Sequence, residues 1–514
     1  MWMSDGELIL VGGALLAAGL GASLFAARFS VPALVLVLGA GMLIGSDGTG
    51  WIEFSDYELA RRIGIIALCL ILFEGGLVAG WREIGPVLRP AVSLAVLGTI
   101  LTAVLTGFVA AWLFDFSTLE GLLVGSVLAA TDAAAVFSVL RTSRLRRRVA
   151  RTLEGESGLN DPVAVLLVIG FIDWIQNPGY GVVDMAGLFA RQLSIGLAFG
   201  LLAGFAGVEL VRRIRLATDG LYPVGTLAIV AVAFGLADVA HGSGFLAVYI
   251  AGLVLGSKEI PARRTVVAFH EGLAWVAQVA MFFTLGLLVF PRQLGDVALE
   301  ATIVAFVSVA VARPLATFVA TAFDRFSVSE RVVLGWAGLR GAVPVVLATF
   351  PVIEGVPRSL EFFNIAFFAV LLSTLLQGAS LERLARALRV TTLMPALPRP
   401  LVGTPEDHAL GARVMEHAVA HEDAIVGLAV RDLGLPREAL VNVIVRGGRA
   451  IPPRGSTKIV SGDVLHILVR DEVAREMEPL FEHWRKGPIR REIASEGEVW
   501  MTMPVYRARP RDEE

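Results

Sequence analysis

A short polar string opens a long apolar stretch, and its residue types indicate ion chemistry. Residues 155–162 read Gly-Glu-Ser-Gly-Leu-Asn-Asp-Pro and lead into the apolar run 163–172, which is typical of a membrane-spanning helix. A charge at the bilayer centre costs about 2.5–3.5 kcal/mol on insertion scales, so it persists where a partner, an ion or water offsets that cost. Ser157 and Asp161 are four residues apart, so on a helix they share a face and both can contact one cation.

Further ionisable groups lie within predicted spans, namely Glu74, Asp132, Glu156 and Arg340. Glu156 and Arg340 are expected to form a structural charge pair, because a guanidinium group is the strongest fixed partner that a protein offers a buried carboxylate. The remaining acids then need a mobile positive charge. Their oxygens, with the hydroxyls of Ser157 and Thr131, suit an alkali cation better than a transition metal. Protons would compete with the cation for Asp161, which is the chemistry of exchange.

Composition sets the class of protein. Of 514 residues, 55% are hydrophobic and 18% are charged, which is too apolar for a soluble chain and typical of a multi-span membrane protein. The net charge of −3 argues against a nucleic-acid partner. The single cysteine excludes a disulfide framework, and the first apolar run lacks the basic flank of a cleaved signal peptide.

Apolar runs of about 20 residues predict an all-α polytopic protein with about thirteen transmembrane helices. Their intervals are 7–27, 31–45, 62–80, 90–114, 119–140, 150–174, 186–211, 222–240, 244–257, 271–290, 297–322, 330–351 and 361–387. Basic residues concentrate in alternate loops, most densely at 141–151. Because such loops stay in the cytoplasm, the pattern predicts an N-terminus outside and a C-terminus in the cytoplasm. The expected location is the inner membrane of a bacterium.

The odd number of spans allows two inverted six-helix repeats around one linking helix, which is the plan of secondary transporters. The fifth span of each half is predicted to be broken, at 131–134 and at 338–344, where charge, glycine or proline interrupts the apolar run. Arg313 precedes Pro314 in another span, and we interpret it as structural, because an arginine can satisfy backbone groups that the proline frees.

Four ordered motifs resemble the NhaP branch of monovalent cation/proton antiporters. They are Leu72–Gly76, Thr131–Val136, Gly155–Pro162 and Gly338–Pro344, and the resemblance covers 7–390. It implies that Asp161 is the exchanging carboxylate. It also implies a homodimer with a rigid interface bundle and a moving core bundle, in which the Glu156–Arg340 pair holds Asn160. The implied cation ligands around Asp161 are Asp132, Ser157 and Thr131, with Glu74 as an outer contributor.

Two details of these motifs concern the transported ion. Ala133 stands where many family members have proline, a form that resembles potassium-linked subgroups, so K⁺ is favoured and Na⁺ or Li⁺ is the alternative. Asn160 stands where some family members have the first of two adjacent aspartates, so this chain has one titrating group fewer. The resemblance therefore favours electroneutral exchange of one cation for one proton, in pH and cation homeostasis. Asn160 also suits a helix cap ahead of Pro162, and the two roles are compatible.

Two more remote function classes are weighed against exchange. A ligand-gated potassium channel predicts a Thr-Val-Gly-Tyr-Gly filter, which the sequence lacks. An intramembrane aspartyl hydrolase with Asp132 and Asp161 as a dyad predicts a Gly-x-Gly-Asp signature, also missing. We therefore expect a secondary transporter that is not an enzyme, needs no cofactor, and binds a monovalent cation and a proton within a lipid bilayer.

Composition changes near the end of the transmembrane domain, residues 1–390. Residues 391–411 are proline-rich and predict a linker, and residues 412–484 predict a small α+β domain. We expect strands near 412–420, 440–446 and 463–469, with helices near 424–432 and 471–484. The pattern resembles a TrkA-C subdomain, which implies cytoplasmic regulation, dimerisation and a small ligand. Residues 485–514 predict a polar tail, and His417 and His421 lack a third ligand for a metal site.

Overall fold

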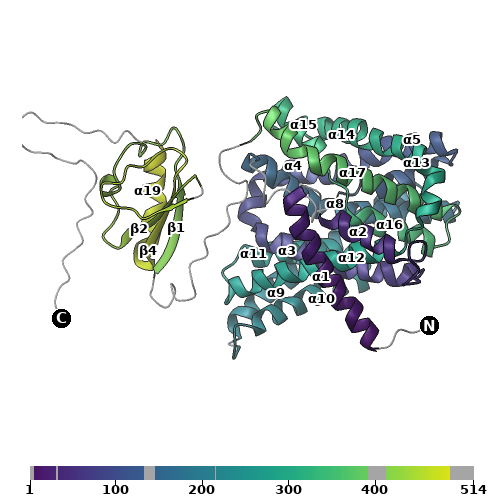
Figure 1. Cartoon of the computed structure of the whole chain (residues 1–514), viewed down its shortest axis with the longest axis horizontal. Coiled ribbons are helices and arrows are strands. Elements are labelled where there is room, and N and C mark those ends of the chain that lie inside the picture. The colour runs from purple at the N-terminus through teal and green to yellow at the C-terminus, as the bar shows by residue number, and fades with distance from the viewer. Residues whose placement is uncertain are drawn as a thin grey trace, which may run out of the picture. The chain divides into compact units, whose positions relative to one another are not determined.

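A computed structural model describes residues 5–29, 33–131, 145–214, 216–391, 412–447 and 449–486. The chain divides into two compact units, residues 1–397 and 398–514. In Figure 1 the first unit is a bundle of helices, and the second is a small sheet with a helix.

Helices fall in every interval that the apolar runs predict. They are α1 (Asp5–Phe29), α2 (Ala33–Ile44), α3 (Tyr57–Ile84), α4 (Leu88–Ser93), α5 (Thr99–Phe114), α6 (Thr118–Ala129), α8 (Arg147–Gln176), α9 (Val182–Arg213), α10 (Leu221–Val239), α11 (Gly244–Gly256), α12 (Arg263–Leu287), α13 (Pro291–Val307), α14 (Arg313–Ala320), α15 (Val328–Trp336), α16 (Ala342–Ile353) and α17 (Ser359–Ala387). Short 3₁₀ or π turns join several of them: η1 (Gly85–Val87), η2 (Leu94–Gly98) and η3 (Ser308–Ala312).

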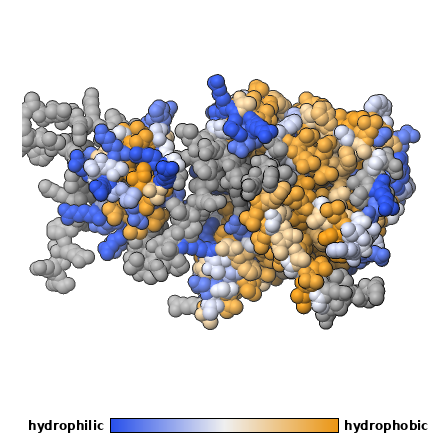
Figure 2. All heavy atoms as spheres, viewed as in Figure 1, coloured by the Kyte–Doolittle hydropathy of each residue, from blue (hydrophilic) through white to orange (hydrophobic). Residues whose placement is uncertain are grey.

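The helical unit has the composition of a membrane protein. Within the described part of the chain, seven helical segments are long and apolar enough to cross a bilayer, and shorter apolar helices accompany them. One of the seven, Tyr57–Phe114, is 58 residues long and covers two predicted spans. Figure 2 shows broad apolar surface over this unit. The predicted all-α polytopic fold is confirmed, whereas the count of thirteen spans and the inverted repeat stay predictions.

The predicted break at 338–344 separates α15 from α16. Helix α15 ends at Trp336 and α16 begins at Ala342, so the intervening backbone is not helical. Pro344 lies in the first turn of α16, where its missing N–H removes no helical hydrogen bond. Helix α17 satisfies two carbonyls at the break: Thr374 Oγ1 donates to Arg340 O at 2.7 Å and Gln377 Nε2 to Trp336 O at 2.8 Å. Protein groups thus replace the lost helical bonds.

The other predicted break is described on one side only. Helix α6 ends at Ala129, and Ala130 has an extended backbone with φ −60° and ψ 137°. Thr131 follows, and it is buried. Residues 132–144, with the predicted ligand Asp132 and the Ala133 that favours K⁺, lie outside the described residues.

The second unit contains a four-stranded antiparallel sheet in the order β1-β4-β2-β3. Its strands are β1 (Ala412–Ala418), β2 (Ala439–Arg446), β3 (Arg449–Ile451) and β4 (Val464–Arg470), followed by helix α19 (Ala474–Lys486). The core includes Ile425, Leu465, Ile467 and Trp484. The small α+β domain is confirmed.

One predicted helix in this unit is wrong. Residues 424–432 form turns that end in the 3₁₀ turn η4 (Val430–Asp432). Gly427 has φ +87°, a conformation that interrupts a right-handed helix. Strand β3 was not predicted, because three residues are too few to show an alternating pattern.

Candidate functional site

The polar string lies near the middle of α8 and is buried. Asp161 and Asn160 are 0% exposed, and Ser157 and Glu156 are 1% exposed. Helix α8 runs without interruption through these residues, so Asn160 is interior to the helix and its interpretation as a cap is wrong. Pro162 has no N–H to donate to the preceding turn, so it frees a backbone carbonyl beside Asp161.

Asn160 joins α8 to the break after α6. Its Nδ2 donates a hydrogen bond to Thr131 Oγ1. Two of the predicted site residues therefore meet, and Thr131 brings the non-helical backbone that follows α6 against α8. The resemblance implied instead that the Glu156–Arg340 pair holds Asn160, and the structure gives Asn160 a different partner.

The predicted pairing of Glu156 with Arg340 is wrong in this structure, because Glu156 is paired with Arg313. Arg313 Nη2 donates to Glu156 Oε1 in an ion pair whose side chains are 3% and 1% exposed. Gly338 makes this approach possible, since a Cβ there would stand 2.7 Å from Arg313 Nε. Sequence reasoning missed the pair because Pro314 offered a local explanation for Arg313, and only tertiary packing brings α14 to α8.

Arg340 lies in the break before α16 and has other partners. Its guanidinium donates to Ser308 Oγ of η3, and Ser308 Oγ is 2.8 Å from Thr106 Oγ1 of α5. Arg340 Nη1 has no hydrogen-bond partner among the described residues. The second break is thus held by a polar network, separate from the charge pair at Glu156.

Glu74, the predicted outer contributor, is buried in α3, 6% exposed. Helix α3 packs against α8, α11 and α12. The ring centroid of the preceding residue, Phe73, is 4.8 Å from the ring centroid of His270 in α12. Glu74 is therefore buried within the helical unit, and its role as an outer contributor stays a prediction.

Sequence reasoning missed a buried acid at the start of α8. Glu154 is 2% exposed, and its Oε2 accepts from Arg151 Nη1 at 2.5 Å. Arg151 Nε also lies 2.8 Å from Glu83 Oε2 at the end of α3. The spacing of three between Arg151 and Glu154 signals a helical ion pair, but the arginine-rich segment 141–151 was interpreted only as a topology anchor.

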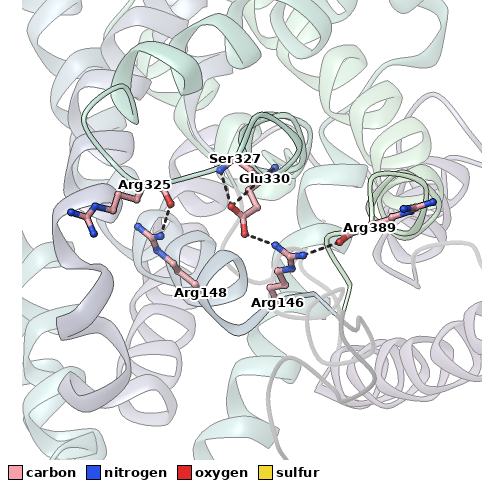
Figure 3. Close-up of polar contacts among 6 residues, drawn as sticks. All are labelled: Arg146, Arg148, Arg325, Ser327, Glu330 and Arg389. Atoms are coloured by element: carbon pink, nitrogen blue, oxygen red, sulfur yellow. Dashed lines mark hydrogen bonds and ion pairs between the residues drawn. The ribbon is translucent and has the colours of Figure 1, made fainter. Parts of the chain in front are cut away.

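The same end of α8 is fastened to α15 and to the end of α17 (Figure 3). Arg146 Nη1 is 3.2 Å from Glu330 Oε1 of α15, and Arg146 Nη2 donates to Arg389 O at 3.3 Å. Arg148 donates to Arg325 O at 2.6 Å. The backbone adds a bond from Arg146 N to Val390 O at 3.0 Å and a β-bridge between Leu145 and Thr391.

In the second unit, His417 is buried beside Asp423. His417 Nε2 is 3.3 Å from Asp423 Oδ2, and its ring lies 5.0 Å from both the Phe481 and Trp484 rings. Burial lowers the pKa of His417, and the nearby Asp423 only partly offsets this. Among the described residues no cluster of three or more possible metal ligands occurs.

Comparison with known proteins assigns both units. Residues 14–387 match the family described as "Sodium/hydrogen exchanger, transmembrane", and residues 414–482 match the TrkA-C domain. The chain is 36% identical over 481 residues to the "K(+)/H(+) antiporter NhaP2" of Shewanella baltica, covering 93% of this chain and 83% of the relative. It is also 36% identical over 469 residues to the "K(+)/H(+) antiporter NhaP" of Alkalimonas amylolytica, covering 90% and 81%.

A solved structure shares the fold of the helical unit. The sodium proton antiporter MjNhaP1 from Methanocaldococcus jannaschii superposes with a TM-score of 0.63 at 24% identity, over 74% of this chain and 99% of that chain. The family match over residues 14–387 and the 36% identity over 93% of this chain together identify the family. This chain belongs to the sodium/hydrogen exchanger family and is an integral membrane cation/proton antiporter, a secondary transporter and not an enzyme, with a TrkA-C domain.

Proposed function

We propose that the chain exchanges K⁺ for H⁺ and that Asp161 carries each in turn. The observation on which this depends is the position of Asp161, fully buried near the middle of a membrane helix. A buried carboxylate is costly while it is charged, and either a proton or a bound cation removes that cost. Because one carboxylate cannot hold both at once, binding of the two ions is mutually exclusive.

The surroundings of Asp161 support this role. Glu156, five residues earlier on α8, is already neutralised by Arg313, so it does not compete for the cation. Ser157 provides a hydroxyl one turn before Asp161, and Asn160 brings the Thr131 hydroxyl to α8. Carboxylate, hydroxyl and freed carbonyl oxygens are hard ligands that suit alkali cations. Asp132 completes the proposed ligand set, with Glu74 as an outer acid.

The choice of K⁺ rests on the relatives, since the Shewanella and Alkalimonas proteins are named K(+)/H(+) antiporters. A more distant relative, 29% identical over 364 residues, is named "Na(+)/H(+) antiporter ApNhaP" and comes from Aphanothece halophytica. Na⁺ is therefore the alternative substrate. With an amide at Asn160 in place of a second acid, one titrating group serves each cycle, and we propose electroneutral exchange of one K⁺ for one H⁺.

The proposed setting is a homodimer in the bacterial inner membrane, with the N-terminus outside and the TrkA-C domain in the cytoplasm. Basic residues in alternate loops support this orientation. The TrkA-C domain, residues 414–482, would bind a small regulatory ligand, and exchange itself needs no cofactor.

Exchange in proteoliposomes with an internal pH dye tests the proposal. K⁺, Na⁺, Li⁺ and Rb⁺ are added in turn, with and without a lipophilic ion that removes the membrane voltage. We expect a response to K⁺ that does not change when the voltage is removed. Asp161→Asn should abolish exchange, whereas Asp173→Asn, at the far end of α8, should retain it. Exchange by Asp161→Asn, or a response to Na⁺ alone, would refute the respective part.

A further inference from the structure

Tyr249 of α11 lies between two of the family motifs. It is 1% exposed. Its backbone packs on Gly76 of α3, where a Cβ would stand 2.6 Å from Tyr249 O, and its ring lies against Gly158 of α8, where any Cβ would overlap the ring. Gly76 therefore admits the backbone of α11 around Tyr249, and Gly158 admits the tyrosine ring itself.

The ring covers the face of α8 that carries two buried acids. Glu154, Gly158 and Asp161 are spaced by four and by three residues, so they follow one another along one face of the helix. The seven helical rises between Glu154 and Asp161 span about 10 Å along the axis. Tyr249 thus stands between Glu154, toward the Arg147 end of α8, and Asp161, near the middle.

The hydroxyl of Tyr249 has no hydrogen-bond partner among the described residues, although it is buried. Buried polar groups are normally satisfied, and one without a partner destabilises the fold. Phenylalanine would pack against Gly158 equally well without that cost. Tyr222, the other buried tyrosine of a neighbouring membrane helix, shows the usual outcome, because its hydroxyl donates to Ile214 O at 3.2 Å.

We infer that Tyr249 is a cation-contact residue on the route between the Arg147 end of α8 and Asp161. In this conformation its ring blocks the path of the cation. When the ring moves aside during transport, its hydroxyl oxygen is a temporary ligand for the dehydrated cation. A hydroxyl that meets its partner only during transport has none in the resting structure. The inference rests on the proposed function, because it takes Asp161 as the destination.

Tyr249→Phe removes the hydroxyl and keeps the ring. We expect the K⁺ concentration for half-maximal exchange to rise about threefold to tenfold, the change that follows from losing one neutral hydrogen-bonding group. The rise should be larger for Na⁺, where it is transported, than for Rb⁺, because a dipole attracts a smaller ion more strongly at its shorter distance. The thermal midpoint in detergent should stay the same or increase, and the pH profile should keep its shape.

Tyr222→Phe is the matched control, because it removes a partnered hydroxyl. It should lower the thermal midpoint and leave the cation dependence unchanged. Wild-type cation dependence in Tyr249→Phe would overturn the inference, and so would a lowered midpoint without a change in ion preference, which would make the hydroxyl structural. Neither result touches the proposed role of Asp161, which fails if Asp161→Asn still exchanges ions.

Discussion

The Glu156–Arg313 ion pair gives a quantitative test of how the buried charges are arranged. Arg313→Met leaves the Glu156 carboxylate, 1% exposed, without its ion partner. Removing one member of a buried pair costs about 3–5 kcal/mol, because the remaining charge stays desolvated. Glu156→Gln should cost a similar amount, because it leaves the buried Arg313 guanidinium without its ion partner. Unfolding by denaturant in mixed micelles, followed by tryptophan fluorescence, measures the free energy of unfolding of each variant.

The double variant decides whether the two residues act as a pair. With both charges removed, no uncompensated ion remains, so the double variant should be more stable than the sum of the single losses by about 2–3 kcal/mol. The same cycle with Arg340→Met is the matched control, because Arg340 bonds Ser308 and not Glu156. Its coupling to Glu156 should be smaller by at least about 1 kcal/mol. Stronger coupling of Glu156 to Arg340 than to Arg313 would refute the arrangement described above.

Two further predictions concern charge and pH. Asn160→Asp adds a second titrating group beside Asp161, so exchange should become sensitive to membrane voltage in the proteoliposome assay; a rate that stays independent of voltage contradicts the stoichiometry argument. Burial lowers the pKa of His417 in the folded domain, so the unfolded chain binds a proton first as pH falls. The TrkA-C unit should therefore keep its full stability above the ordinary histidine pKa of about 6.5 and lose it progressively below. His417→Gln should reduce this acid sensitivity in thermal unfolding, and the exposed His421→Gln should leave it unchanged; equal sensitivity in both variants would exclude His417 as the cause.

The helical fold was predictable because its signal is local. Each apolar run shows its helix without reference to any other part of the chain, and glycine and proline mark the break between Trp336 and Ala342 in the same way. The failed helix at 424–432 has a local cause too, since nothing in the sequence shows that Gly427 adopts φ +87°.

The burial of several predicted site residues could be predicted from the sequence, but their pairings could not. Burial of Asp161, Asn160, Ser157 and Glu156 follows from their place in an apolar span. Which arginine reaches Glu156 depends on the tertiary arrangement that brings the Arg313 side chain to α8, and sequence spacing carries no information about that. Tyr249 was missed for the same reason, because a tyrosine in an apolar run resembles any other core aromatic until its neighbours are known.

The pairing of Leu145 with Thr391 has a mechanical consequence. The chain leaves the helical unit after Thr391, close to the start of α8. There Leu145 forms a β-bridge with Thr391, and the Arg146 guanidinium donates to Arg389 O. A force on that segment acts first on α8, the helix that contains Asp161. A displacement of the TrkA-C unit that pulls on this segment therefore reaches α8 without passing through another helix.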